Sequence, residues 1–121
     1  MQDQTKTWEC PLCYGEGGHR DRCNARHLTQ APAAPMIHSN GTGYRDLYAQ
    51  MEAAAQALTA AEKAICEASP NGRDYYTQAF GTMGRAQAEH YRRLEYLAGV
   101  KAELEIIWMA ISDQERNRGN R

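Results

Sequence analysis

The sequence predicts an all-α protein in which a long antiparallel helical hairpin follows a small cysteine-rich segment. The 121 residues are rich in alanine and glutamate and poor in β-branched residues, a composition that favours helix over strand. Two long runs repeat apolar residues every three or four positions, as one face of a helix requires. Three of the four cysteines are gathered beside histidines near the start of the chain.

Changes of composition divide the chain into four parts. Residues 1–28 hold the clustered cysteines, and residues 29–35 form a proline- and alanine-rich linker that is expected to be extended and to separate its neighbours. The helical hairpin is expected over residues 36–112. Residues 113–121 are polar and are expected to form a disordered tail.

The cysteine-rich segment has the spacing of a zinc site. Cys10 and Cys13 form a C-x-x-C knuckle, which lets two thiolates hold one tetrahedral zinc ion, and Cys23 is the expected third ligand. Three thiolates and a histidine close the coordination sphere and leave no position for a reactive water molecule. We therefore expect a structural zinc ion that replaces a hydrophobic core in this small segment.

The fourth zinc ligand is either His27 or His19, since each stands four residues from Cys23. With His19 the pattern resembles a retroviral-type zinc knuckle whose histidine comes one residue late. With His27 it resembles a zinc finger that has a short terminal helix. His27 is preferred, because its longer loop strains the site less.

The first long helix is expected from about residue 44 to 68. Cys66 near its end is expected to be a small buried hydrophobic residue. Small residues dominate the apolar stripe of this helix and allow a second helix to approach closely. The stripe consists of Leu47, Met51, Ala54, Leu58, Ala61 and Ile65.

The second long helix is expected from about residue 82 to 112. Its histidine, His90, lies on the apolar stripe and is expected to be buried and hydrogen-bonded rather than a ligand contact. The residues from Ile106 to Met109 form an apolar band wider than one partner helix can cover, so we expect a homo-oligomer that is at least a dimer. The stripe consists of Met83, Ala86, His90, Leu94, Leu97, Val100, Leu104, Trp108 and Ile111.

The segment from Ser69 to Gly81 between the two helices is the candidate ligand site. A simple reversal between helices needs only about two to five residues, so this longer polar loop is available for binding. The alternative is a structural loop, in which its aromatic rings plug the end of the hairpin and Arg73 pairs with Asp74. The candidate ligand-binding residues are Arg73, Asp74, Tyr75, Tyr76, Gln78 and, from the other end of the first helix in an oligomer, Asn40.

These side chains suit a small anionic, aromatic ligand such as a nucleotide. Arg73 would bind phosphate, Tyr75 and Tyr76 would stack on a base, and the amides and Asp74 would contact ribose or base edges. No phosphate loop, catalytic triad or open metal site accompanies them, so the protein is not expected to be an enzyme.

The overall charge and the N-terminal sequence limit the other possibilities. A net charge of −1 argues against a protein that coats nucleic acid. There is neither a signal-peptide pattern nor an apolar run of about 18 residues, so we expect a cytoplasmic protein without membrane association.

The hairpin region, Met36 to Ile111, resembles small helical-hairpin proteins encoded by tailed phages and prophages. The motifs that carry the resemblance are Ile-His-Ser-Asn-Gly-Thr before the first helix and Pro-Asn-Gly-Arg-Asp-Tyr-Tyr-Thr-Gln between the helices. That family has no established activity, and the cysteine-rich segment would be an addition to it. The resemblance implies a phage gene expressed in a bacterial cytoplasm, a setting that includes counter-defence proteins.

Three functions therefore remain in view. The leading prediction is a phage-type protein that sequesters a small anionic ligand, such as a signalling nucleotide of a host defence. The first alternative is a zinc-finger regulator that binds nucleic acid through Trp8 and Tyr14 and through three arginines, Arg20, Arg22 and Arg26. The second is an inhibitor or adaptor that binds a host protein.

Overall fold

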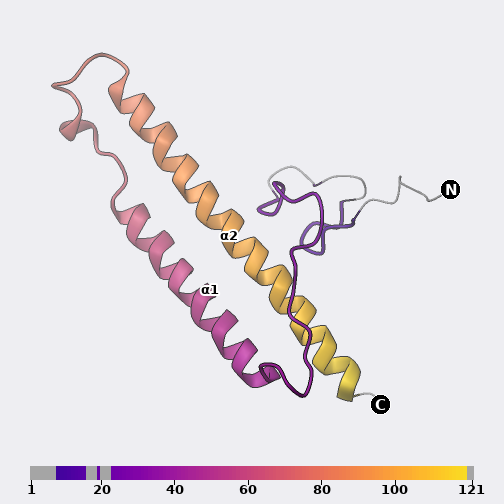
Figure 1. Cartoon of the computed structure of the whole chain (residues 1–121). Helices are drawn as coiled ribbons and strands as arrows, with labels where there is room; N and C mark the ends of the chain where they lie inside the picture. Colours follow the sequence, from indigo (N-terminus) through magenta and orange to yellow (C-terminus); the bar gives the residue numbers. More distant parts are fainter. Residues whose placement is uncertain (1–7, 16–18, 20–22, 120–121) are drawn as a thin grey trace.

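The computed structural model of the chain describes residues 8–15, 19 and 23–119. Within these residues the regular structure consists of helix α1 (Tyr44–Glu67), the short 3-10 helix η1 (Gly72–Asp74) and helix α2 (Thr82–Gly119), without any strand. The predicted all-α class is confirmed. The two α-helices run antiparallel and pack against each other (Figure 1).

Helix α1 packs against α2 through the predicted apolar stripe. Every member of that stripe is buried or half-buried, and Leu47 is the most deeply placed. At the open end of the hairpin, the ring of Tyr48 meets that of Trp108 edge to face at 5.2 Å between centroids. Near the middle, Lys101 of α2 donates to Glu62 of α1 at 3.0 Å. The hairpin is thus held by an apolar seam with polar contacts beside it.

The end of α1 is tied to α2 by a hydrogen-bonded histidine. The Ser69 hydroxyl donates to the Cys66 carbonyl oxygen at 2.6 Å, which commits its only proton. His90 Nε2 lies 3.0 Å from the same hydroxyl oxygen and is therefore the donor in this contact. With only 6% of its surface exposed, His90 is the buried, hydrogen-bonded residue that the sequence predicts.

Two residues of the predicted apolar faces are placed differently. Val100 is 47% exposed, because its neighbour Lys101 takes the position that faces α1. Cys66 is exposed rather than buried, since it lies one residue from the end of α1. The predictions of a buried Val100 and a buried Cys66 are wrong.

Helix α2 does not end at residue 112 but continues to Gly119, so most of the expected disordered tail is helical. Ion pairs between Asp113 and Arg116 and between Glu115 and Arg118 support these turns at the favourable three-residue spacing. Both arginines stand in the last turn, where positive charge complements the helix dipole.

Gln114 in the same part of α2 binds the backbone of the chain that precedes α1. Its amide nitrogen donates to the Pro35 carbonyl oxygen, and its amide oxygen accepts from the Ile37 N–H, each at 2.8 Å. The linker over residues 29–37 is irregular and follows α2 towards the start of α1 (Figure 1). The Gln114 side chain thus uses both its donor and its acceptor to hold the backbone at the end of the linker against α2.

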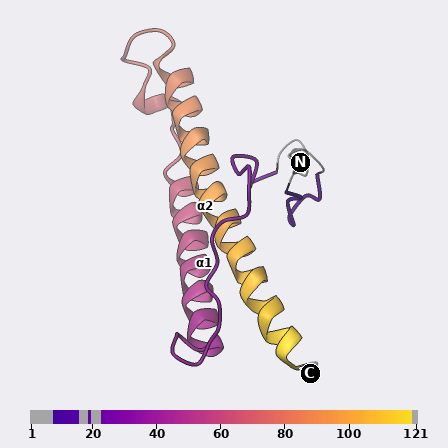
Figure 2. The ribbon, with the colours of Figure 1, turned by 45° about the vertical axis from the view of Figure 1, so that its right-hand side comes forward.

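The described residues between 8 and 28, here called the metal segment, pack on the side of α2 that faces away from α1 (Figure 2). The two parts share one buried cluster, so the linker does not hold them apart as the composition suggests. This packing also covers Ile106, part of the apolar band from which we predict self-association. The cluster consists of Cys10, Cys23, Ala25, Ala102 and Ile106.

Neither α1 nor α2, over the residues that are described, combines the length and the apolar character needed to cross a bilayer.

Candidate metal centre

Four side chains of the metal segment converge in an arrangement that could hold a metal ion. Their ligand atoms all lie within 4.8 Å of one another. The Sγ atoms of Cys10 and Cys23 are 3.9 Å apart, and Cys13 Sγ is 3.7 Å from His19 Nδ1. The four residues are Cys10, Cys13, His19 and Cys23.

These separations match a tetrahedral site. Metal–sulfur bonds of about 2.3 Å and metal–nitrogen bonds of about 2.1 Å at the tetrahedral angle place two sulfurs about 3.8 Å apart and a sulfur and a nitrogen about 3.6 Å apart. The observed 3.9 Å and 3.7 Å are each within a fraction of an ångström of these values. The four side chains are thus placed so that they could hold one metal ion.

His19, and not the preferred His27, is the histidine in this cluster. Its Nε2 donates to the Leu28 carbonyl oxygen at 2.6 Å, which leaves the lone pair of Nδ1 directed at the sulfurs. His27 instead places its Nε2 2.7 Å from a carboxylate oxygen of Glu103 on α2. The preference for His27 is therefore corrected, because a partner on α2 holds this histidine away from the thiols.

The local backbone and its neighbours shape the site. The N–H of Tyr14 donates to the Cys10 carbonyl oxygen at 2.7 Å, closing the knuckle, and Tyr14 takes the left-handed conformation with a φ of 57°. Trp8 covers the other side, with its ring edge to face against His19 at 5.8 Å between centroids. The cluster is thus enclosed by its own turn, by an aromatic ring and by α2.

Burial raises the pKa of the Cys23 thiol to about 11, and hydrogen bonds with Cys13 and Cys10 add to this effect. In the metal-free protein Cys23 therefore keeps its proton at neutral pH. A metal ion must displace that proton, since only the thiolate is a ligand.

From this displacement we predict that the apparent zinc affinity rises with pH. Each displaced proton contributes about a tenfold gain in affinity per pH unit below the thiol pKa, so the gain between about pH 6 and about pH 8 is at least a hundredfold. Competition against a chromophoric chelator of known pH dependence measures this slope. Cys66→Ser, which removes the exposed thiol, should leave the slope unchanged; a zinc affinity independent of pH contradicts the prediction.

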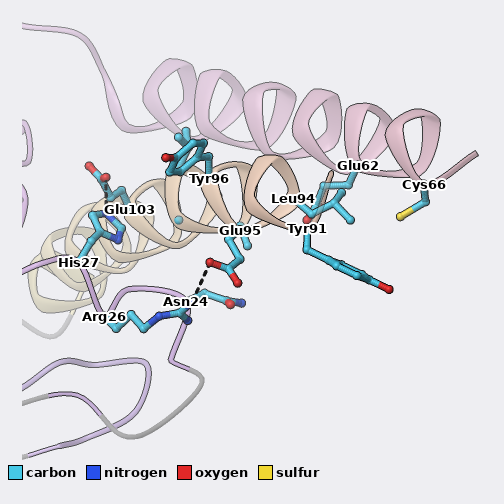
Figure 3. Close-up of a pocket in the computed structure, with 13 residues that line it drawn as sticks. Asn24, Arg26, His27, Glu62, Cys66, Tyr91, Leu94, Glu95, Tyr96 and Glu103 are labelled. Atoms are coloured by element: carbon cyan, nitrogen blue, oxygen red, sulfur yellow. Dashed lines mark hydrogen bonds and ion pairs between the residues drawn. The ribbon is translucent and has the colours of Figure 1, made fainter. Parts of the chain in front are cut away.

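The metal segment is fastened to α2 by one ion pair and one hydrogen bond on either side of a glycine. Arg26 pairs with Glu95 at 3.3 Å and His27 with Glu103 at 2.7 Å (Figure 3). Gly99 lies between them, and a methyl group there would come within 3.2 Å of the His27 ring. A glycine in the middle of a helix is unfavourable by about 1 kcal/mol relative to alanine, and here it permits the close approach of the segment.

A hollow of about 840 Å³ runs beside this junction (Figure 3). Each acidic side chain that lines it already has a partner within the chain, Arg26 for Glu95, His27 for Glu103 and Lys101 for Glu62. The hollow lies where the metal segment docks on α2.

The predicted ligand residues between the helices remain together at the tip of the hairpin, residues 69–81 (Figure 1). Arg73 and Asp74 lie in η1 and are exposed, and no ion pair joins them in the described structure. Tyr75 is half-buried, whereas Tyr76 is 79% exposed and Phe80 is fully exposed. The rings of Tyr76 and Phe80 thus do not plug the end of the hairpin, contrary to the structural alternative.

Asn40 belongs to the opposite end of the molecule. Its N–H donates to His38 Nδ1 at 3.3 Å in the turn before α1. The 24 residues of α1 separate this turn from the tip by about 36 Å at 1.5 Å per residue. Within one chain Asn40 cannot join the other predicted ligand residues.

Among the residues proposed to bind nucleic acid, two already have partners within the chain. Trp8 packs on His19 and Arg26 pairs with Glu95, while Tyr14 stays exposed. Arg20 and Arg22 lie outside the described residues.

The ligand-binding residues predicted from the sequence do not include two arginines of α2, Arg85 and Arg93. They line a hollow beneath the tip, together with the predicted residues Tyr75 and Gln78. The four-residue steps from Arg85 to Glu89 and from Glu89 to Arg93, directly after a polar loop, are the signal that could have drawn attention to them.

Comparison of the chain with protein-family models, with curated proteins and with solved structures finds no match. The resemblance to phage-encoded hairpins therefore stays a prediction.

Proposed function

We propose that this protein is a non-enzymatic binding protein, braced by a structural zinc ion, whose working end is the hairpin tip. Zinc is the metal that three thiolates and one imidazole in a tetrahedral arrangement suit best. The four ligands leave no open position for a substrate or a reactive water molecule, which supports a structural role. The zinc would fix the metal segment on α2 and leave the tip free.

The exposure of the tip is the observation that carries the proposal. Tyr76 and Phe80 present their rings to solvent, although large aromatic side chains are usually at least partly covered. The tip contains polar groups as well, so it can combine apolar contact with hydrogen bonds, as ligand sites do. A small anionic ligand, such as the signalling nucleotide of a bacterial defence, is the form of binding that we propose.

A protein partner is the second candidate, and the exposure of Phe80 favours it. A fully exposed phenylalanine ring at a protruding loop has the character of an anchor that a pocket on another protein receives. A ligand of nucleotide size covers such a ring less completely than a protein surface does. The two candidates share the tip and differ in what occupies it.

Native mass spectrometry of the protein made in a bacterial cytoplasm tests these proposals together. We expect one zinc ion per chain and a further retained small molecule, whose mass identifies its class. A photo-crosslinking amino acid at Phe80, with exposed Lys63 on α1 as the control position, captures a protein partner if there is one. A zinc-loaded chain that retains nothing and gives no adduct specific to position 80 contradicts the proposed function.

The same spectrum reports self-association, which stays a prediction. The apolar band on which this prediction depends is partly covered in the folded chain, because the metal segment covers Ile106 and Trp108 packs on Tyr48. An adduct of twice the chain mass at position 80 would place the tip itself between two copies.

We predict that removing both exposed rings has little effect on stability. In the double variant Tyr76→Ser, Phe80→Ser the melting temperature should stay close to the wild-type value, because exposed substitutions usually change stability by about 0.5 kcal/mol or less. The half-buried neighbour Tyr75→Ser is the matched comparison and should be more destabilising. Calorimetry measures both variants; a loss of about 3 kcal/mol in the double variant would support the structural role of the loop instead.

A further inference from the structure

A small hollow, here called the tip hollow, lies directly beneath the hairpin tip. It has a volume of about 230 Å³ and lies between the loop and the first turns of α2. This is smaller than the roughly 300–1,000 Å³ of pockets for drug-sized ligands, so it suits one compact group. The side chains that line it include Tyr75, Gln78, Arg85, Glu89, His90 and Arg93.

The charged side chains that line the tip hollow are two exposed arginines and one glutamate. Arg85, Glu89 and Arg93 follow one another at four-residue steps on one face of α2. Within the part of the chain that is described, neither arginine forms an ion pair, whereas Arg26 and Lys101 each do. Two guanidinium groups against one carboxylate leave a net positive charge around the hollow.

The wall of the tip hollow is fixed before any ligand arrives. His90 is held by the Ser69 hydroxyl at 3.0 Å and is 6% exposed, so its ring does not move freely. Thr82 donates its hydroxyl proton to the Ala79 carbonyl oxygen at 2.7 Å, which fixes the loop against the start of α2.

We propose that the tip hollow binds the phosphate group of a small phosphorylated molecule through the guanidinium groups of Arg85 and Arg93, whose two positive charges outweigh the one carboxylate of Glu89. Guanidinium groups suit phosphate because their planar donors can bind two oxygens at once. Tyr75, half-buried at the edge of the hollow, supplies a ring face for the organic part, and Gln78 supplies an amide. The phosphate role predicted for Arg73 thus passes to Arg85 and Arg93, since Arg73 does not line the hollow.

This inference rests on the proposal that the hairpin tip is the binding end, and a titration of the full zinc-loaded chain tests it. Adenosine monophosphate is the probe, and chemical-shift changes in ¹H–¹⁵N spectra report its affinity and its location. Adenosine without phosphate and inorganic phosphate without the nucleoside are the two ligand controls. We expect adenosine monophosphate to bind and to shift resonances of residues 75–93, and adenosine to bind at least tenfold more weakly.

Three arginine variants make the test specific. Arg85→Gln and Arg93→Gln should each weaken binding by about tenfold to a hundredfold, the effect of losing a charge-assisted hydrogen bond. Arg92→Gln is the matched control, because it removes the same charge from an exposed position next to Arg93 that does not line the hollow. Thermal unfolding of all three variants shows that each is folded.

The outcomes separate the possible failures. Equal weakening by Arg92→Gln, equal binding of adenosine, or no binding at millimolar probe overturns the phosphate site. Binding of inorganic phosphate as tight as that of the nucleotide supports the site and assigns it to free phosphate. If the phosphate site is overturned while position 80 still gives a specific crosslink, the tip remains the binding end, and only the ligand class is wrong.

Discussion

Cys23→Ser is expected to abolish the binding of one zinc ion per chain. Cys23 is a buried member of the four-ligand cluster, and a serine hydroxyl does not replace a thiolate as a zinc ligand. Structural zinc sites of small segments bind with about 10–16 kcal/mol, so the loss corresponds to several orders of magnitude in affinity. Inductively coupled plasma analysis of protein purified without chelator measures the zinc content directly.

The same variant should loosen the metal segment while the hairpin stays helical. Hydrogen exchange is expected to lose protection at residues 23–28 and to keep it in α1 and in α2 near Tyr48 and Trp108, where the contacts do not involve the metal segment. Cys66→Ser removes a thiol that lies outside the cluster and should retain the full zinc content. Wild-type protein that contains no zinc, or a Cys23→Ser variant that retains it, contradicts the proposed centre.

Ile106→Asp is expected to release the metal segment from α2 by disrupting apolar packing, without removing a metal ligand. Ile106 is 5% exposed and belongs to the cluster shared with Cys10, Cys23 and Ala25, on the side of α2 away from α1. The substitution removes apolar burial and places a carboxylate among buried sulfurs, so we expect the docking of the segment to weaken by about 2–5 kcal/mol. The hairpin should still form, because its seam with α1 is untouched.

Trp8 fluorescence and zinc content together report this release. The indole ring should become more exposed, and zinc should be held more weakly but still in a one-to-one ratio, since all four ligands remain. Val100→Asp is the control, because it introduces the same carboxylate on the same helix at a residue that is already 47% exposed. A cooperative loss of all helix in Ile106→Asp would mean that the metal segment is needed for the hairpin itself.

The sequence predicted the helices well because their signals are local. The three- and four-residue apolar spacing predicted a helix, expected from about residue 44 to 68, and α1 spans Tyr44–Glu67. The clustering of three cysteines likewise indicated three of the four converging residues. Both signals depend on neighbours a few positions away, which the sequence displays directly.

The errors came where distant residues decide the outcome. The choice between His19 and His27 depends on Glu103 of α2, which lies 76 positions from His27. The apolar band from Ile106 to Met109 suggests a surface for another copy, whereas the chain covers Ile106 with its own metal segment. The apolar periodicity of α2 shows that this face is buried, but it does not identify the segment that covers it.

The end of α2 and the tip hollow show the same limit. Ion pairs and the contacts of Gln114 with the linker keep residues beyond 112 helical, and polar composition alone suggests a frayed tail. In the sequence, charges spaced like Arg85 and Arg93 are typical of the solvated face of a helix. Only the return of the loop over the first turns of α2 brings them beside Tyr75 and Gln78.

Because the metal segment docks on α2, it has to wait for α2 during synthesis of the chain. The segment leaves the ribosome well before residues 95–106, on which it packs, because its contacts span about 76 positions of sequence. During that interval the cysteines can already capture zinc, while their apolar neighbours have no surface to cover them. The metal would thus keep the segment compact until α2 emerges, so that zinc scarcity in the cell should appear first as aggregation of nascent chains.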